Sequence, residues 1–245
     1  MEFSLSPFLI QYGGFGIRYY SLMYLLALLL SYAWLTKVAK YDREKIADFC
    51  LYGFLWVVLG SRLGYALFYQ PQWFWTEPLS VLKIWEGGMS FHGGLIAAAL
   101  WIAYFLKKQR WDFWRFADAL VVPIILGIGF GRIGNFLNGE LWGRITDVPW
   151  CFHVEGWEGC RHPSQLYQFL ANLITFGILC LSYFRSRKSG VTAALFLICY
   201  GIGRSVIEML WREPSWVWMG LTAGTWLSLP MILVGGILLI LRLRR

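Results

Sequence analysis

Three short segments of this 245-residue sequence carry side chains that could bind an anion or move a proton. The first, residues 87–95, reads GGMSFHGGL and surrounds His92 with glycines. Histidine is the side chain best suited to proton transfer near neutral pH, and glycine lets a second group approach closely. The segment fits a proton-transfer role for His92 and a structural histidine in a helix-entry turn about equally well.

The second segment, residues 131–144, reads GRIGNFLNGELWGR and concentrates polar side chains. Arg132 and Asn135 are three residues apart and share one face of a helix. The dipeptide Asn138-Gly139 signals a turn, and Glu140 follows it. A guanidinium offers phosphate a planar fork of donors, to which asparagine adds more. This density favours a cradle for an anionic headgroup over a merely polar helix end.

The third segment, residues 200–208, reads YGIGRSVIE. Tyr200, Arg204 and Glu208 follow at four-residue intervals and project from one helix face. We expect Arg204 and Glu208 to pair, which lowers the cost of burying their charges. The pair is either a structural ion pair or a means of presenting an arginine to phosphate.

Four arginines lie within or at the ends of apolar stretches: Arg18, Arg62, Arg132 and Arg204. Inserting an arginine at the centre of a membrane costs at least about 2.5–3.5 kcal/mol of free energy. The presence of each of these arginines therefore needs an explanation. The side chains of Arg18 and Arg62 could extend toward lipid headgroups. Arg204 lies deeper in its apolar stretch, so the same explanation fits it less well. We therefore predict an enzyme that acts on an anionic phospholipid.

The elements that position these residues follow from the composition, which is 58% hydrophobic and 15% charged. Soluble domains carry about 25% charged residues, so the composition argues against a water-soluble enzyme and excludes a disordered chain. Seven stretches approach the roughly 20 apolar residues that span a bilayer, and none alternates as a strand would. They lie near Tyr19–Thr36, Phe49–Tyr69, Met89–Leu106, Phe116–Phe136, Leu166–Phe184, Val191–Leu210 and Trp226–Leu241.

We therefore predict an all-α, polytopic membrane bundle of seven transmembrane helices. It would form a single membrane-embedded catalytic domain over residues 1–245, with an outer loop region at about 138–165. Most basic residues fall in alternate connectors and at the chain end, namely at 37–45, 107–115, 185–188 and 242–245. The positive-inside rule makes these ends cytoplasmic, with the N-terminus outside and the C-terminus inside. The opposite connectors hold Lys83, Arg144, Arg161 and Arg212.

Two outer connectors have further features. Residues 70–88 are rich in aromatic side chains, which suits a segment lying among lipid headgroups. Cys151 and Cys160 share the other outer loop, where they form either a disulfide or two free thiols. Cys50, Cys180 and Cys199 fall in the apolar stretches and are expected to be packing residues.

At the same residues, the sequence resembles the bacterial prolipoprotein diacylglyceryl transferases. The block GRIGNFLNGELWGR (131–144) is similar to the family's most specific block. Further similar blocks follow in the family's order from about Arg18 to Leu233: RYYSLMYLL (18–26), GSRLGYALFYQ (60–70), GGMSFHGGL (87–95), RHPSQLY (161–167), YGIGRSVIEMLWREP (200–214) and TWLSLPMIL (225–233).

The resemblance implies a seven-helix bacterial inner-membrane enzyme whose active site faces the outer leaflet. It implies transfer of the sn-1,2-diacylglyceryl group of phosphatidylglycerol to the lipobox cysteine of a prolipoprotein signal peptide. A thioether would form and glycerol 1-phosphate would be released, as the first step of lipoprotein maturation. It implies no metal, no cofactor and no nucleic-acid partner.

The resemblance also implies roles for single residues. Arg132 matches the family's phosphatidylglycerol-contacting arginine, and Arg204 matches its essential arginine in the sixth span, with Glu208 as its partner. His92 matches a histidine that is a candidate for assisting thiol deprotonation; the alternative is that the two arginines suffice. Further matched positions, which we expect to contribute to substrate binding, are Tyr20, Asn135, Glu140, Gly143 and Tyr200.

The sequence departs from the family's usual residues at four positions, which are Ser21, Gln168, Trp211 and Thr225. Gln168 stands where glutamate is usual, and Trp211 resembles a one-residue insertion. We expect the departures to affect the outer rim and precursor contacts.

Three other classes of membrane protein are alternatives to a phospholipid-dependent enzyme. A transporter or channel also uses buried Arg–Glu pairs and broken helices, although we find no inverted repeat. An intramembrane protease needs a zinc, paired-aspartate or GxSxG-like serine motif, which the sequence lacks. A structural membrane scaffold remains open from pattern alone.

Overall fold

The computed structural model describes residues 1–3, 6, 8–12 and 15–244. The chain forms two compact units. The first unit contains residues Met1–Trp34 and Trp114–Arg245, and the second contains Leu35–Phe113. Each unit is built of long helices and carries short elements at their ends.

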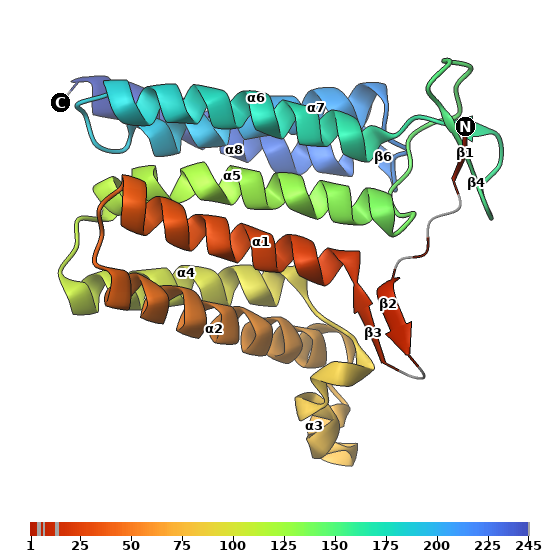
Figure 1. Ribbon diagram of the computed structural model, residues 1–245, viewed down its shortest axis with the longest axis horizontal. Coiled ribbons are helices and arrows are strands. Elements are labelled where there is room, and N and C mark those ends of the chain that lie inside the picture. The colour runs from red at the N-terminus through yellow and green to blue at the C-terminus, as the bar shows by residue number, and fades with distance from the viewer. Residues whose placement is uncertain (4–5, 7, 13–14, 245) are drawn as a thin grey trace. The chain divides into compact units, whose positions relative to one another are not determined.

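The first unit is a group of long helices that run alongside one another (Figure 1). They are α1 (Tyr19–Ala33), α5 (Phe113–Leu137), α6 (Ser164–Arg185), α7 (Val191–Leu210) and α8 (Ala223–Arg244). Helix α7 packs against both α6 and α8. Glycines bring α7 and α8 close together, because a side chain on Gly235 would lie 2.9 Å from the carbonyl oxygen of Ala194.

Short strands lie outside the helices of this unit. They are β1 (Glu2–Phe3), β2 (Phe8–Tyr12), β3 (Phe15–Arg18), β4 (Phe152–Val154), β5 (Cys160–Arg161), β6 (Val217–Trp218) and β7 (Leu221–Thr222). Strand β4 lies between β1, its parallel partner, and β5, its antiparallel partner. The other four strands pair as the hairpins β2–β3 and β6–β7. The all-α description therefore holds for the long elements only.

A disulfide joins Cys151 to Cys160, with Cα atoms 5.5 Å apart. Cys151 directly precedes β4, and Cys160 begins β5, where it lies opposite His153. The sequence left a disulfide and free thiols open, and the structure contains the disulfide. It links the segment before β4 to β5 within the loop between α5 and α6.

A buried carboxylate fixes the start of α7. Asp118 of α5 accepts hydrogen bonds from the backbone N–H groups of Gly190 at 2.6 Å and Ala193 at 2.8 Å. The first N–H groups of a helix have no partner within the helix, so Asp118 supplies the missing acceptor from another helix. Gly190 has a φ of 91°, which glycine adopts without strain.

Replacing Asp118 with alanine should lower the free energy of unfolding by about 2–4 kcal/mol. The substitution leaves two buried N–H groups without acceptors, each worth about 1–2 kcal/mol. Chemical denaturation in detergent measures the change. An unfolding curve like that of the native protein would show that Asp118 does not hold α7.

The second unit is built on two helices, α2 (Arg43–Tyr69) and α4 (Phe91–Gln109), which pack closely. A side chain on Gly64 would lie 2.7 Å from the Cα atom of Gly93, so only glycines permit this crossing. The π-helix η1 (Trp34–Val38) leads into the unit. The segment between the two helices contains α3 (Trp73–Thr76), η2 (Pro78–Leu82) and η3 (Ile84–Glu86).

Arg62 of α2 holds this connecting segment from inside. Its side chain is 2% exposed and donates to the carbonyl oxygens of Val81 at 3.1 Å, Ser80 at 2.6 Å and Gly88 at 3.2 Å, as well as to that of Gly87. From the sequence we considered that Arg62 extends toward lipid headgroups, and the structure shows that it does not. Buried carbonyl oxygens satisfy its donors instead.

Replacing Arg62 with lysine should release residues 78–88. A lysine ammonium lacks the fork that reaches several carbonyl oxygens together, so amide hydrogen exchange in this segment should quicken at least tenfold, while exchange in the middle of α5 should stay unchanged. Unaltered hydrogen exchange in residues 78–88 would show that Arg62 does not hold this segment.

Six of the described helices are long and apolar enough to cross a membrane: α1 with η1, α2, α5, α6, α7 and α8. The chain is thus a polytopic helical membrane protein. Helix α4 forms where the stretch Met89–Leu106 was expected but is not among the six, because His92 and two glycines begin it and Lys107 and Lys108 end it. Seven crossings therefore stay a prediction.

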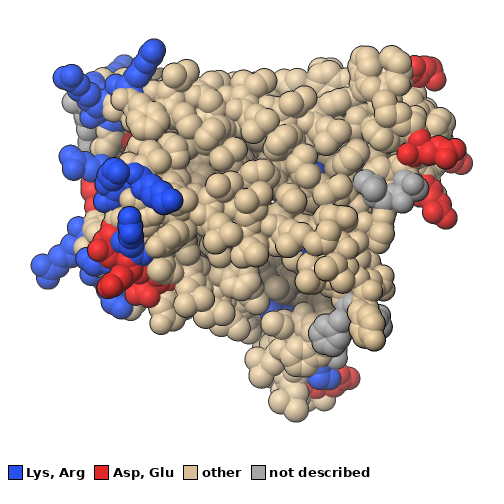
Figure 2. Space-filling model, in the orientation of Figure 1, with Lys and Arg blue, Asp and Glu red and all other residues tan. Residues whose placement is uncertain are grey.

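Charged residues gather at the ends of the helices (Figure 2). In the first unit, Lys and Arg lie on the α6–α7 connector and at the end of α8, and in the second unit on the η1–α2 connector and at the end of α4. This is the distribution on which the expected orientation rests. Arg245 lies outside the described residues.

Candidate active site

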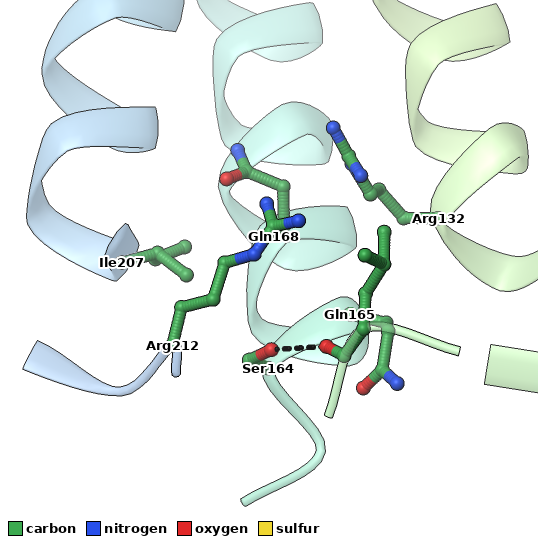
Figure 3. Close-up of a pocket in the computed structure, with 7 residues that line it drawn as sticks. Arg132, Ser164, Gln165, Gln168, Ile207 and Arg212 are labelled. Carbon is green, nitrogen blue, oxygen red and sulfur yellow. Dashed lines mark hydrogen bonds between the residues drawn. The ribbon is translucent and has the colours of Figure 1, made fainter. Parts of the chain in front are cut away.

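A small pocket opens in the first unit, where α5, α6 and the end of α7 meet (Figure 3). The residues that line it are Arg132, Leu141, Ser164, Gln165, Gln168, Ile207 and Arg212. The side chains of Arg132 and Arg212 approach it from opposite sides (Figure 3). Its free volume of about 10 Å³ leaves room for about one water molecule, so a larger ligand would have to displace side chains.

Arg132 is oriented by a chain of hydrogen bonds. Its guanidinium donates to Oδ1 of Asn135 at 3.2 Å, and Nδ2 of Asn135 donates to Glu140 at 3.0 Å. Nδ2 of Asn138 donates to the other carboxylate oxygen at 3.3 Å. Gly139 makes the turn between them with a φ of 70°. Glu140 thus accepts from the amide nitrogens of both asparagines, and among the described residues no carboxylate forms an ion pair with Arg132.

Arg212 is oriented by Glu208. The guanidinium and the buried carboxylate form an ion pair at 3.3 Å, one helical turn apart. Gly224 of α8 packs directly on the carboxylate, because a side chain there would lie 2.7 Å from Oε2 of Glu208. We expected Glu208 to pair with Arg204, but it pairs with Arg212. Among the described residues, Arg204 has no ion pair.

Positive charge accumulates around the pocket. Burial lowers the pKa of Arg212 from its ordinary value, and the charges of Arg132 and Arg204 lower it further, while Glu208 raises it. Arginine keeps its proton throughout. Three guanidiniums therefore interact electrostatically here, and no Asp or Glu occurs among the described residues that line the pocket.

The backbone of Arg212 is held by the loop that follows α5. Gly143 forms an antiparallel bridge with Arg212, and its N–H donates to the carbonyl oxygen of His162 at 2.9 Å. A side chain on Gly143 would contact the backbone oxygen of Trp211 and lie 2.8 Å from Cβ of His162. Only glycine fits between these two segments.

A second loop contact comes from Arg161, whose guanidinium donates to the carbonyl oxygen of Gly143 at 3.1 Å and pairs with Glu213 at 3.1 Å. The first turn of α6 completes the wall. Ser164 donates to the carbonyl oxygen of Leu141 at 3.0 Å, and Gln165 donates to that of Glu140. The loop, α6 and the end of α7 therefore position the pocket together.

The other predicted site residues occupy different places. Tyr20 of α1 packs on Gly134 and accepts a hydrogen bond from Tyr24 at 3.0 Å. Tyr200 stacks on Phe196 and packs against the apolar cluster of α5 and α6. Neither tyrosine lines the pocket, and neither does Arg204.

His92 belongs to the second unit, where it is exposed in the first turn of α4. That turn begins at Ser90, whose side chain accepts from the N–H of Gly93 and whose own N–H donates to Ser61 at 2.8 Å. The role of His92 stays a prediction.

Sequence reasoning missed Arg212 as a site residue and treated it as an outer connector charge. Its signal was present, because it follows Glu208 at the four-residue spacing of a helical ion pair. Gln168 was expected to affect the rim, and it instead lines the pocket. A neutral amide there leaves the positive charge of the two arginines undiminished.

This arrangement can bind a phosphate and stabilise added negative charge on it. Guanidinium–phosphate contacts are charge-assisted and geometrically specific. Donors fixed before reaction need no reorganisation as charge develops.

The sequence is similar to proteins of one known family. Residues 7–241 match the family model described as prolipoprotein diacylglyceryl transferase. A phosphatidylglycerol–prolipoprotein diacylglyceryl transferase of Methylobacillus flagellatus is 42% identical, covering 98% of this chain and 97% of the relative. One from Polynucleobacter asymbioticus is 44% identical, with 96% and 95% covered. A third, from Aeromonas salmonicida, is 41% identical, with 96% and 89% covered.

Proposed function

The chain belongs to the prolipoprotein diacylglyceryl transferase family and is a transferase of lipoprotein biosynthesis, and we propose that it transfers the sn-1,2-diacylglyceryl group of phosphatidylglycerol to the lipobox cysteine of a prolipoprotein. The bond between the diacylglyceryl carbon and the phosphate oxygen breaks, and its electron pair leaves with the phosphate. The thiolate sulfur bonds to that carbon. The products are a thioether and glycerol 1-phosphate.

The pocket between Arg132 and Arg212 is the observation that supports this chemistry best. The leaving phosphate gains negative charge as the carbon–oxygen bond breaks, and two guanidiniums can stabilise that charge. A fixed donor at such a position contributes about 10²–10³-fold to the rate. Arg204 would add positive potential, while Asn135, Glu140 and Glu208 orient the two arginines and Gly143 holds the loop. We keep Tyr20 and Tyr200 as candidate lipid contacts.

His92 is the proposed base for the thiol. A cysteine thiol has a pKa near 8.5, so little thiolate exists at neutral pH without help. Replacing His92 with glutamine should lower kcat about 10²-fold at pH 7. The loss should shrink above pH 8.5, where the thiol ionises unaided. A variant as fast as the native protein across this pH range would remove His92 from the mechanism.

We further propose seven crossings of the bacterial inner membrane, with the N-terminus outside and the active site toward the outer leaflet. The basic helix ends support a cytoplasmic C-terminus. The Cys151–Cys160 disulfide supports an oxidising compartment for the loop at about 138–165. In this arrangement residues 1–245 act as one catalytic domain.

The test is transfer by the purified protein in vesicles that contain phosphatidylglycerol and a lipobox peptide. Mass spectrometry should show the peptide heavier by one diacylglyceryl group, together with free glycerol 1-phosphate. A peptide whose cysteine is replaced by serine is the control. An unmodified lipobox peptide would contradict the proposal, and solute flux across the vesicles would favour a transporter.

A further inference from the structure

A row of three buried side-chain amides begins in the arginine pocket and continues along α6. Gln165, Gln168 and Asn172 lie three and four residues apart, so they share one face of the helix. They are only 2%, 5% and 2% exposed. Gln165 and Gln168 line the pocket, and Nε2 of Gln168 donates to Oδ1 of Asn172 at 3.3 Å.

The hydrogen-bonding capacity of this row is incomplete. Oε1 of Gln165 and Nδ2 of Asn172 are buried and have no partner among the described residues. A buried polar atom without a partner costs about 1–3 kcal/mol, and native structures hold few of them. One such atom is an acceptor and the other is a donor, and they belong to residues about two helical turns apart, so the row can serve a headgroup that carries more than one hydroxyl.

The row packs closely against α5 at Gly129. A side chain at this glycine would lie 3.2 Å from Cδ2 of Phe169 and 3.6 Å from Cβ of Asn172. Thr175, the next polar residue on this face, already donates to the carbonyl oxygen of Ala171 at 2.9 Å. The unmet polar capacity therefore lies toward the pocket end of α6.

Charge determines which polar groups this row can accept. Two guanidiniums line the same pocket, and the described lining residues include no carboxylate. A cationic headgroup such as ethanolamine would be repelled there. An uncharged hydroxyl is not repelled, and it can donate to one amide and accept from another.

We propose that Gln165, Gln168 and Asn172 form a subsite for the hydroxyl groups of the lipid headgroup, and that this subsite selects glycerol. The inference rests on the proposed function, because the phosphate between the arginines brings the headgroup to the amides. A site built to bond a hydroxyl leaves its own polar groups unpaired when the hydroxyl is missing. Such sites discriminate by large factors in kcat/KM against the analogue that lacks the hydroxyl.

The test compares phosphatidylglycerol with phosphatidylpropanol, whose headgroup has three carbons and no free hydroxyl. The ratio of kcat/KM for the two lipids is measured in the transfer assay with the full-length protein. The native protein should prefer phosphatidylglycerol by at least about tenfold. Asn172→Leu should reduce this ratio at least about fivefold, whereas the matched control Thr175→Val should keep it. A ratio within one protein is independent of how much of that protein is folded.

Two results would overturn the subsite while leaving the proposed function intact. The native protein could use both lipids equally, or Asn172→Leu could keep the native ratio. Absence of any transfer from phosphatidylglycerol by the native protein would overturn the proposed function and the subsite with it.

Discussion

Replacing Arg132 with glutamine will lower kcat/KM for phosphatidylglycerol at least about 100-fold. Glutamine keeps a donor for Asn135, which the guanidinium reaches at 3.2 Å, but it removes the positive charge. A fixed donor to a developing negative charge is worth about 2.7–4 kcal/mol, or 10²–10³ in rate. The transfer assay in vesicles measures the loss.

The matched control is Arg187→Gln, in the exposed α6–α7 connector at the opposite end of the first unit. It removes the same charge far from the pocket and should leave kcat/KM within about twofold. The unfolding midpoint of each variant in detergent shows whether the fold is intact. A folded Arg132→Gln protein with native activity would remove Arg132 from the site.

Replacing Gly143 with alanine will lower kcat/KM about 100-fold without changing a charge. The new methyl group would contact the backbone oxygen of Trp211 and lie 2.8 Å from His162. Backbone on one side and a packed side chain on the other cannot both yield, so the bridge to Arg212 must open. Displacing a binding group by about 1 Å can cost 10² in rate.

Gly177→Ala is the control for this substitution. Gly177 lies within α6, where a side chain would meet no described atom within 4 Å. Alanine also favours the helix over glycine by about 1 kcal/mol, so the control should be as active and at least as stable as the native protein. Native kcat/KM in Gly143→Ala would show that the bridge does not position Arg212.

The long helices could be predicted because their signal is local. A run of apolar residues and its charged ends lie within one segment, so the expected stretch Val191–Leu210 coincides with α7 and Phe49–Tyr69 lies within α2. The short strands could not be predicted in the same way. Strand β1 is two residues long and pairs with β4, some 150 residues away.

The candidate site was predictable only in part for the same reason. Arg132 and Asn135 share a helix face, and their hydrogen bond follows from spacing. The partner of Glu208 depends on how the chain leaves α7, which the bridge from Gly143 to Arg212 determines. The acceptors of Arg62 are carbonyl oxygens around 20 residues away, and no residue type marks them in the sequence.

Affinity for phosphatidylglycerol in nanodiscs of uncharged phosphatidylcholine tests the central claim most directly. If one phosphate lies between Arg132 and Arg212, both Arg132→Gln and Arg212→Gln should raise Kd at least about tenfold, or 1.4 kcal/mol each. Native affinity in the folded Arg212→Gln protein would contradict a phosphate site shared by these two arginines.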